Sequence, residues 1–82
     1  MRNIKRYSNR KLYDTQDKQY VTLGDVAGFV RNGEEVKVTD HVSGADLTSV
    51  TLAQIIFEEE KRNSRLGVEG LRRIIQHGLT VE

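Results

Sequence analysis

The sequence has no cysteine, no proline and no tryptophan among its 82 residues. Without cysteine, the chain has no disulfide bond, no thiolate metal ligand and no thiol nucleophile. Without proline, internal repeats or low-complexity segments, nothing marks an internal domain boundary. The sequence therefore predicts one small domain over residues 1–82.

Long apolar runs are also missing. The longest is the triplet at residues 55–57, whereas a membrane-spanning helix needs about 20 apolar residues. The basic start of the chain is followed by polar residues, which is not the pattern of a secretory signal. We therefore expect no membrane span and a cytoplasmic location. A lone chain of this size buries only about 60 to 65% of its unfolded surface, so we also expect a homo-oligomer.

Charge is nearly balanced overall, with a net value of +1, but it is unevenly distributed. Six basic residues against two acidic ones give residues 1–20 a net charge of +4. Two basic residues against eight acidic ones give residues 21–60 a charge of −6. Five basic residues against two acidic ones give residues 61–82 a charge of +3. This distribution predicts a dipolar surface with two candidate sites for a polyanion.

Turn residues and apolar spacing predict an α+β fold for this single domain. A basic β-hairpin is expected over residues 1–21, a helix over 22–33, a second hairpin over 35–48, and two C-terminal helices over 50–62 and 67–78.

The first helix has the clearest end signals. Thr22 followed by Asp25 resembles a capping box, and Gly33 suits the left-handed conformation that closes a helix. Ser49 or Thr51 is the expected N-cap of the second helix. The apolar spacing of the third helix extends as far as residue 79.

An enzyme function has little support in these residues. His41 and His77 are 36 residues apart, with no cluster of metal ligands around them. The consecutive Glu58, Glu59 and Glu60 splay around a helix by about 100° per residue and cannot converge on one metal ion. No glycine pattern matches a P-loop or a dinucleotide-binding loop. We expect no catalytic residue, no cofactor and no metal.

The expected N-terminal hairpin combines basic, hydrogen-bonding and aromatic residues. Lysine and arginine contact phosphates, and arginine and asparagine also bind base edges in a major groove wide enough for a two-stranded ribbon. The tyrosines either contact phosphates and bases, or pack beneath the sheet and hold it against the helices. Ile4 and Leu12 are expected on the core side, and Asp14 is expected to hold an arginine in place. The candidate DNA-binding residues are Lys5, Arg6, Tyr7, Asn9, Arg10, Lys11 and Tyr13.

The same hairpin belongs to a longer motif. Residues 4–15 read IKRYSNRKLYDT, followed by YVTL at residues 20–23 and LAQIIFEEE at residues 52–60. These segments resemble the N-terminal DNA-binding domain of the polyhydroxyalkanoate (PHB/PHA) synthesis repressors, a family of accumulation regulators. The resemblance covers residues 3–60, and residues 66–77 are similar to the Leu-rich helix that follows in the family.

The resemblance implies a bacterial repressor that binds double-stranded operator DNA near genes for phasins and polyhydroxyalkanoate metabolism. It also implies release from DNA when granules of the polymer bind the protein, so the expected location is the nucleoid or the granule. Members of the family continue into a further accumulation-regulator region that these 82 residues do not include. The chain is then either an excised domain or a short relative that binds DNA without that sensor.

A second DNA-binding hypothesis uses the C-terminal basic patch. The helices expected near residues 51–60 and 68–77 would act as a helix-turn-helix that presents Arg72 and Arg73 to the major groove. Against it, the segment at residues 61–67 is longer than the usual turn of three or four residues.

The amphipathic helices suggest a third hypothesis, an interaction module. Their apolar faces would form the core and a self-association surface, or would attach to polymer granules or to another protein. The residues expected on the self-association surface are Leu52, Ile55, Ile56, Phe57, Leu71 and Ile75.

Overall fold

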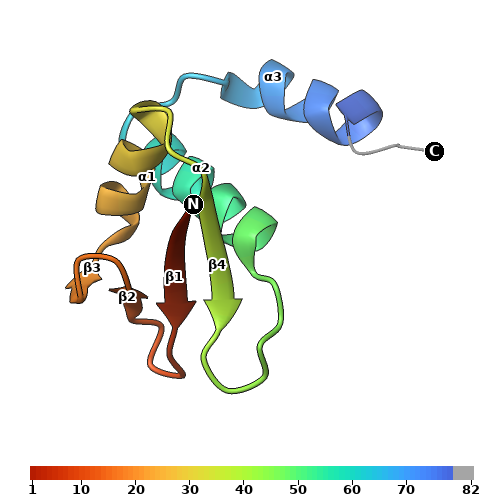
Figure 1. Cartoon of the computed structure of the whole chain (residues 1–82). Helices are drawn as coiled ribbons and strands as arrows, with labels where there is room; N and C mark the ends of the chain where they lie inside the picture. The colour runs from red at the N-terminus through yellow and green to blue at the C-terminus, as the bar shows by residue number, and fades with distance from the viewer. Residues whose placement is uncertain (79–82) are drawn as a thin grey trace.

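The computed structural model describes residues 1–78 and shows a four-stranded sheet with helices on one face (Figure 1). The spatial order of the strands is β3-β2-β1-β4. This arrangement confirms the predicted α+β class. The strands are β1 (Arg2–Arg6), β2 (Leu12–Asp14), β3 (Gln19–Val21) and β4 (Val36–Asp40). The helices are α1 (Leu23–Arg31), α2 (Thr48–Arg62) and α3 (Gly67–Arg73), which runs on into one π-helical turn (Ile74–Gly78).

The first three strands form an antiparallel meander. Leu12 lies opposite Arg6 in β1 and opposite Val21 in β3. The β1–β2 turn is closed by hydrogen bonds from the amide of Tyr7 to the carbonyl of Lys11 and from the amide of Arg10 to the carbonyl of Tyr7. The expected N-terminal hairpin is therefore present, and β3 continues it by one short strand.

The second expected hairpin is present only in reduced form. β4 runs parallel to β1, with Ile4 opposite Val38. After the turn that follows β4, the returning chain makes one isolated antiparallel bridge, between Thr39 and Asp46, and then enters α2. Local alternation predicted the strand, but it carries no information about which distant strand supplies the partner.

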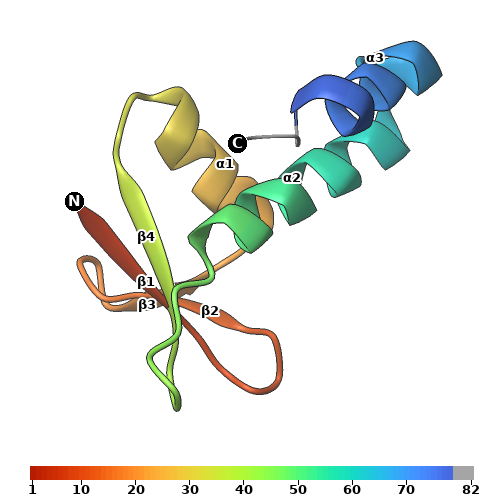
Figure 2. The same cartoon turned by 90° about the vertical axis from the view of Figure 1, so that its right-hand side faces the viewer.

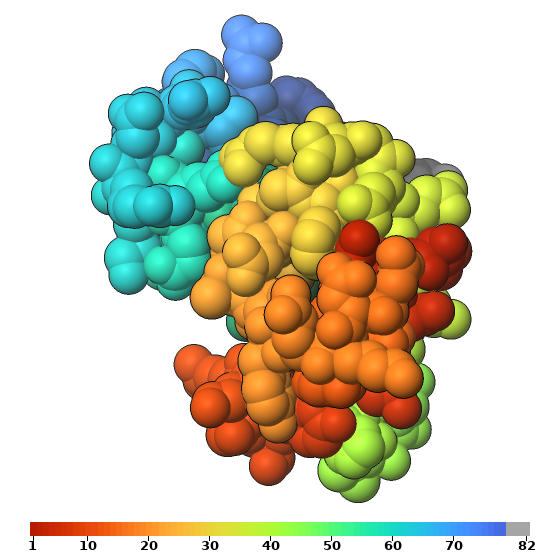
Figure 3. Space-filling view, turned by 60° about the vertical axis from the view of Figure 1, so that its left-hand side comes forward, coloured from red at the N-terminus to blue at the C-terminus, as the bar shows by residue number. Residues whose placement is uncertain are grey.

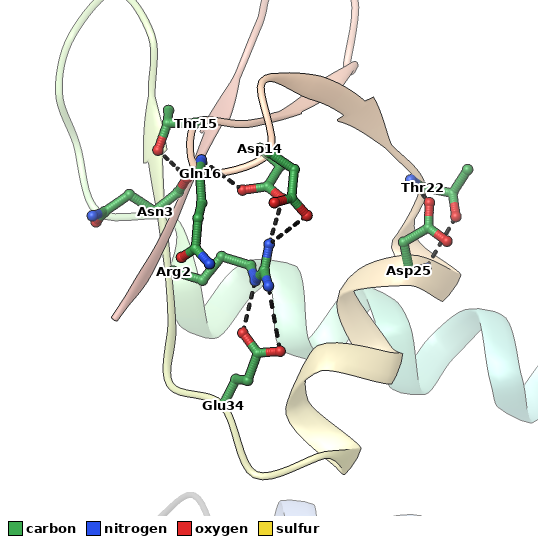
Figure 4. Close-up of polar contacts among 9 residues, drawn as sticks. Arg2, Asn3, Asp14, Thr15, Gln16, Thr22, Asp25 and Glu34 are labelled. Atoms are coloured by element: carbon green, nitrogen blue, oxygen red, sulfur yellow. Dashed lines mark hydrogen bonds and ion pairs between the residues drawn. The ribbon is translucent and has the colours of Figure 1, made fainter.

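Helix α1 begins as its sequence predicts. The amide of Asp25 donates to Thr22 Oγ1 at 3.1 Å, and the amide of Thr22 donates to the Asp25 carboxylate at 2.9 Å (Figure 4). At the other end, Gly33 has a φ of +89°, a conformation that residues with a Cβ rarely adopt.

Helix α2 begins earlier than predicted. Its N-cap is Leu47, without a side-chain cap, so the expected caps at Ser49 and Thr51 are wrong. Thr51 lies inside the helix, fully buried, and its hydroxyl donates to the carbonyl of Leu47. Thr48 is the first residue of the helix, and its Oγ1 accepts from the amide of Val38 in β4 at 2.9 Å. This long-range hydrogen bond fixes the start of α2 against the sheet. The expected extension of the last helix to Leu79 lies outside the described residues.

The core lies between the sheet and the first two helices. Ile4 and Val38, from the two parallel strands, have no exposed surface, and neither has Val26 from α1. Leu12 is also buried, so both hairpin residues predicted to face the core do so. The buried apolar residues are Ile4, Leu12, Val21, Val26, Ala27, Val38 and Ile55.

A buried ion-pair network ties the start of β1 to the sheet and to α1 (Figure 4). Arg2 is only 8% exposed and donates to Asp14 at 2.5 Å and to Glu34 at 2.7 Å. Its guanidinium also lies 4.0 Å from the ring centre of Phe29. The hydrogen bonds to Glu34, Asp14 and Asp17 raise the pKa of Arg2. Asp14 thus holds an arginine, as expected, and Arg2 contributes no free charge to the surface.

Within residues 1–78, no helix combines the length and the apolar character that crossing a membrane requires.

Replacing Ile4 with alanine is expected to destabilise the fold by about 2 to 5 kcal/mol, because it leaves a cavity at the centre of the core. Chemical denaturation measures this change. Val68→Ala is the control, since Val68 is 73% exposed, and its effect should stay within about 0.5 kcal/mol. Equal stability of the two variants would contradict this description of the core.

Candidate nucleic-acid interface

The face of the sheet opposite the helices is open. Figure 2 shows α1 and α2 on one side of the sheet, and no element of the described chain covers the other. Alternation along each strand decides which side chains lie there, because neighbours of buried residues point the opposite way. These strand residues include two lysines and no carboxylate. They are Asn3, Lys5, Tyr13, Tyr20, Lys37 and Thr39.

Aromatic rings cluster on this open face. The ring centre of Tyr13 lies 5.4 Å from that of Tyr20 and 6.4 Å from that of Tyr7, both in edge-on geometry. The ring of His41 lies 4.3 Å from that of Tyr7, tilted by 36°. The tyrosines therefore sit on the far side of the sheet from the core rather than between the sheet and the helices.

Lysine ammonium groups border the aromatic cluster. Lys5 lies opposite Tyr13 in the β1–β2 ladder, and Lys11 Nζ lies 5.3 Å from the ring centre of Tyr20. Neither lysine pairs with a carboxylate within residues 1–78. Their charge is therefore available to an external anion.

The two aspartates at the β4 edge accept hydrogen bonds from their own loop. Asp40 accepts from the amides of Ser43 at 2.8 Å and Val42 at 3.0 Å, and these bonds lower its pKa. Asp46 accepts from the amide of Thr48 at 2.9 Å, and the pKa of Asp46 is likewise lowered. The Asp40 carboxylate is thus directed to loop amides, and the Asp46 carboxylate to the amide at the start of α2.

The predicted DNA-binding residues divide between three places. Lys5, Tyr7 and Tyr13 gather on the open face together with Lys11. Asn9 and Arg10 form the hairpin tip, where Asn9 Oδ1 accepts from the amide of Lys11 and Arg10 has a φ of +66°.

Arg6 lies on the opposite side. It shares the helix-facing side of β1 with Ile4 and borders a hollow of about 240 Å³ between the hairpin and α2. The residues that line this hollow are Arg6, Arg10, Leu12, Leu23, Gln54, Phe57 and Glu58.

Five residues of the open face are not among the predicted DNA-binding residues: Asn3, Tyr20, Lys37, Thr39 and His41. Tyr20 and Lys37 alternate with buried neighbours, so strand periodicity alone was sufficient to place them. For His41, the sequence predicted neither a metal-binding nor a catalytic role. Only the parallel pairing of β4 with β1 brings it against Tyr7.

The arginines of the C-terminal basic patch, unlike Lys5 and Lys11, pair with a carboxylate. Arg72 pairs with Glu69 at 2.9 Å, and Arg73 approaches the same carboxylate at 3.9 Å. Helix α3 buries no residue, and it lies at the opposite end of the molecule from the hairpin tip (Figure 3). The two basic regions therefore form separate surfaces.

Glu60 fixes the turn between α2 and α3. Its carboxylate accepts from the Ser64 hydroxyl at 2.6 Å and from the amide of Gly67 at 2.9 Å. It also accepts from the amides of Arg65 and Leu66. These four hydrogen bonds lower the pKa of Glu60 to about 2. One of the three consecutive glutamates thus caps the start of α3.

Comparison with known proteins supplies the family. Residues 3–63 match the family described as the PHB/PHA accumulation regulator DNA-binding domain. The chain belongs to this family. The matching segment contains α1, α2 and all four strands except Arg2 at the start of β1, and it ends before α3. The open face therefore lies within the DNA-binding domain, whereas Arg72 and Arg73 lie outside it.

Two relatives share the domain. A protein from Allochromatium vinosum, described as uncharacterized, is 46% identical over 59 residues, which cover 72% of this chain and 39% of the relative. A protein from Thiocystis violacea, described as uncharacterized and located in the phbA 5′ region, is 46% identical over 59 residues and is covered over 43% of its length. The match thus spans about two fifths of these relatives. No solved structure matches the chain significantly.

The cap on α3 makes a pH-dependent contribution to stability. Because the pKa of Glu60 is lowered from 4.5 to about 2, its ionised form stabilises the fold. This stabilisation is complete above about pH 4.5 and is lost as the pH falls toward 2. We expect Glu60→Gln to lose helical circular dichroism at pH 6 and to converge on the wild type near pH 2.

Glu58→Gln is the matched control, since the Glu58 carboxylate is half exposed and its one ion pair, with Lys61, spans 3.9 Å. It should follow the wild-type curve across the whole range. If Glu60→Gln also follows the wild-type curve, the cap contributes nothing to the stability of α3.

Proposed function

We propose that this domain binds double-stranded DNA through the open face of its sheet and the tip of the β1–β2 hairpin. The observation that carries the proposal is the chemistry of that face: lysines and tyrosines on its strands, no carboxylate among them, and an adjoining tip that carries Arg10. Membership of a DNA-binding family supports the same conclusion.

The geometry suits a duplex better than a single strand. The three tyrosine rings meet edge to face, so they do not offer a flat platform for successive bases. β1 and β2 are the two inner strands of the sheet, so the proposal places the tip of their hairpin toward the bases of the major groove and the lysines of the open face near the phosphates. Lys5 and Lys11 then contact phosphates, Tyr7 and Tyr13 donate hydroxyl hydrogen bonds, and Arg10 reaches a base edge.

The family and the relatives support a regulatory role. We propose that the protein is a repressor of genes for polyhydroxyalkanoate synthesis and granule-associated proteins, acting in the cytoplasm at the nucleoid or the granule. The family describes regulators of PHB/PHA accumulation, and one relative is described by its position in the phbA 5′ region. Binding of the polymer itself is part of the same proposal.

Replacing Arg10 and Lys11 together with alanine is expected to weaken DNA binding and to flatten its salt dependence. The slope of log Kd against log salt should fall by about one for each lost phosphate contact, because fewer counterions are released on binding. Titration of promoter DNA from the phbA 5′ region at several salt concentrations measures both effects.

Arg72→Ala with Arg73→Ala is the matched control, since it removes two cations from the other basic patch. We expect its affinity and salt slope to equal those of the wild type. If the Arg72→Ala, Arg73→Ala variant binds DNA more weakly and the hairpin variant binds like the wild type, α3 and not the hairpin is the DNA-binding element. If the wild type shifts no DNA at low salt but is retained on polymer beads, the alternative of a surface-binding module is favoured.

We also propose that the domain self-associates through exposed apolar residues of α2 and of the turn after α3. Of the residues predicted for this role, Ile55 is 8% exposed and belongs to the core, and Leu52 packs against that core. Ile56 and Phe57 remain exposed on α2, and Ile75 is 64% exposed. A symmetric pair would present two hairpins to two half-sites, which raises affinity beyond that of one short hairpin.

Introducing Phe57→Glu together with Ile75→Glu is expected to convert the oligomer to a monomer, since two carboxylates would have to be buried at the interface. Light scattering after size-exclusion chromatography measures the mass. Val30→Glu, at an exposed apolar position on α1, is the control and should keep the wild-type mass. A wild-type mass for the double variant would exclude this surface.

A further inference from the structure

We propose that residues 41–45, the first part of the loop between β4 and α2, are a second DNA-contacting element, in which Val42 packs against the methyl group of a thymine. The inference rests on the proposed function and adds to it an element that the N-terminal motif does not contain.

The loop lies beside the hairpin tip. Because β1 and β4 are parallel neighbours with Arg6 opposite Asp40, the chain leaves both strands at the same end of the sheet (Figure 1). The amide of His41 donates to the carbonyl of Arg6 at 2.9 Å, and the His41 ring lies against Tyr7. Figure 3 shows the two segments at the same end of the molecule. Loop and hairpin therefore form one continuous surface.

The loop is held in one conformation by its own hydrogen bonds. Asp40 uses its carboxylate for the amides of Val42 and Ser43 and its carbonyl for the amide of Gly44. The amide of Ala45 donates to Ser43 Oγ at 3.1 Å, and Gly44 provides the positive φ of +77° that the turn requires. A loop that is already ordered loses little conformational entropy when it binds a partner.

The chemistry of the loop indicates contact with a base. Val42 is 85% exposed, although nothing in the fold requires an apolar side chain at the tip of a loop. Residues 41–45 contain no carboxylate, and the flanking carboxylates of Asp40 and Asp46 accept hydrogen bonds from the amides of Val42, Ser43 and Thr48.

An isopropyl group gains nothing from a charged phosphate. The apolar feature that the major groove offers is the C5 methyl group of thymine. The neighbouring tip carries Arg10 and Lys11, which favour DNA over an apolar protein surface as the occupant.

The test uses a duplex selected by the wild-type protein from a random-sequence pool, and the same duplex with uracil in place of every thymine. Val42→Ala is expected to lose about threefold to tenfold in affinity for the thymine duplex, as the loss of a few buried methyl contacts implies. The uracil duplex should bind the wild type more weakly, and the affinity of Val42→Ala should change little between the two duplexes. Val68→Ala, at a valine of similar exposure on α3, is the matched control and should equal the wild type on both.

The outcomes separate this inference from the proposed function. If Arg10→Ala with Lys11→Ala weakens binding while Val42→Ala and His41→Ala do not, the hairpin contacts DNA and the loop does not. If Val42→Ala weakens binding equally on the two duplexes, the thymine contact is wrong. If neither the hairpin variant nor the loop variants change affinity, the proposed function is wrong and the inference is lost with it. Circular dichroism verifies that each variant is folded.

Discussion

The parallel ladder between β1 and β4 is the interaction on which the rest of the structure depends. It joins the first strand to a segment more than thirty residues away, with Arg2 opposite Val36 and Arg6 opposite Asp40. This pairing places Ile4 and Val38 side by side in the core. It also brings the two loops to the same end of the sheet and leads the chain into α2 on the helix-covered side.

The second organising feature is the placement of the carboxylates. Asp14 and Glu34 bind the buried Arg2, Asp40 and Asp46 accept from loop amides, and Glu60 caps α3. Each of these groups stabilises local structure. Asp46, which forms a bridge with Thr39 and interacts with Lys37, borders the open face. The strand residues of the open face include two lysines and no carboxylate although the net charge is only +1, and these five carboxylates are hydrogen-bonded within the protein.

Much of this could be predicted from local patterns. The capping box at Thr22 and Asp25, the glycine that closes α1 and the core side of the hairpin follow from interactions between residues close in sequence. The partner of β4 and the start of α2 could not be predicted, since both depend on hydrogen bonds between distant segments, such as that from Val38 to Thr48. Arg2 was counted as surface charge because its partners, Asp14 and Glu34, are distant in the sequence.

The sequence by itself determined the α+β class, the basic hairpin and the resemblance that led to the family, because these depend on periodicity and on a contiguous motif. Only the tertiary structure decided which face each basic residue occupies. Alternation along β1 places Lys5 and Arg6 on opposite faces of the sheet. The helices cover the face of Arg6 and leave the face of Lys5 open. Likewise, His41 reaches Tyr7 through a parallel pairing that no local pattern encodes, since strand partners are chosen by the packing of the whole domain.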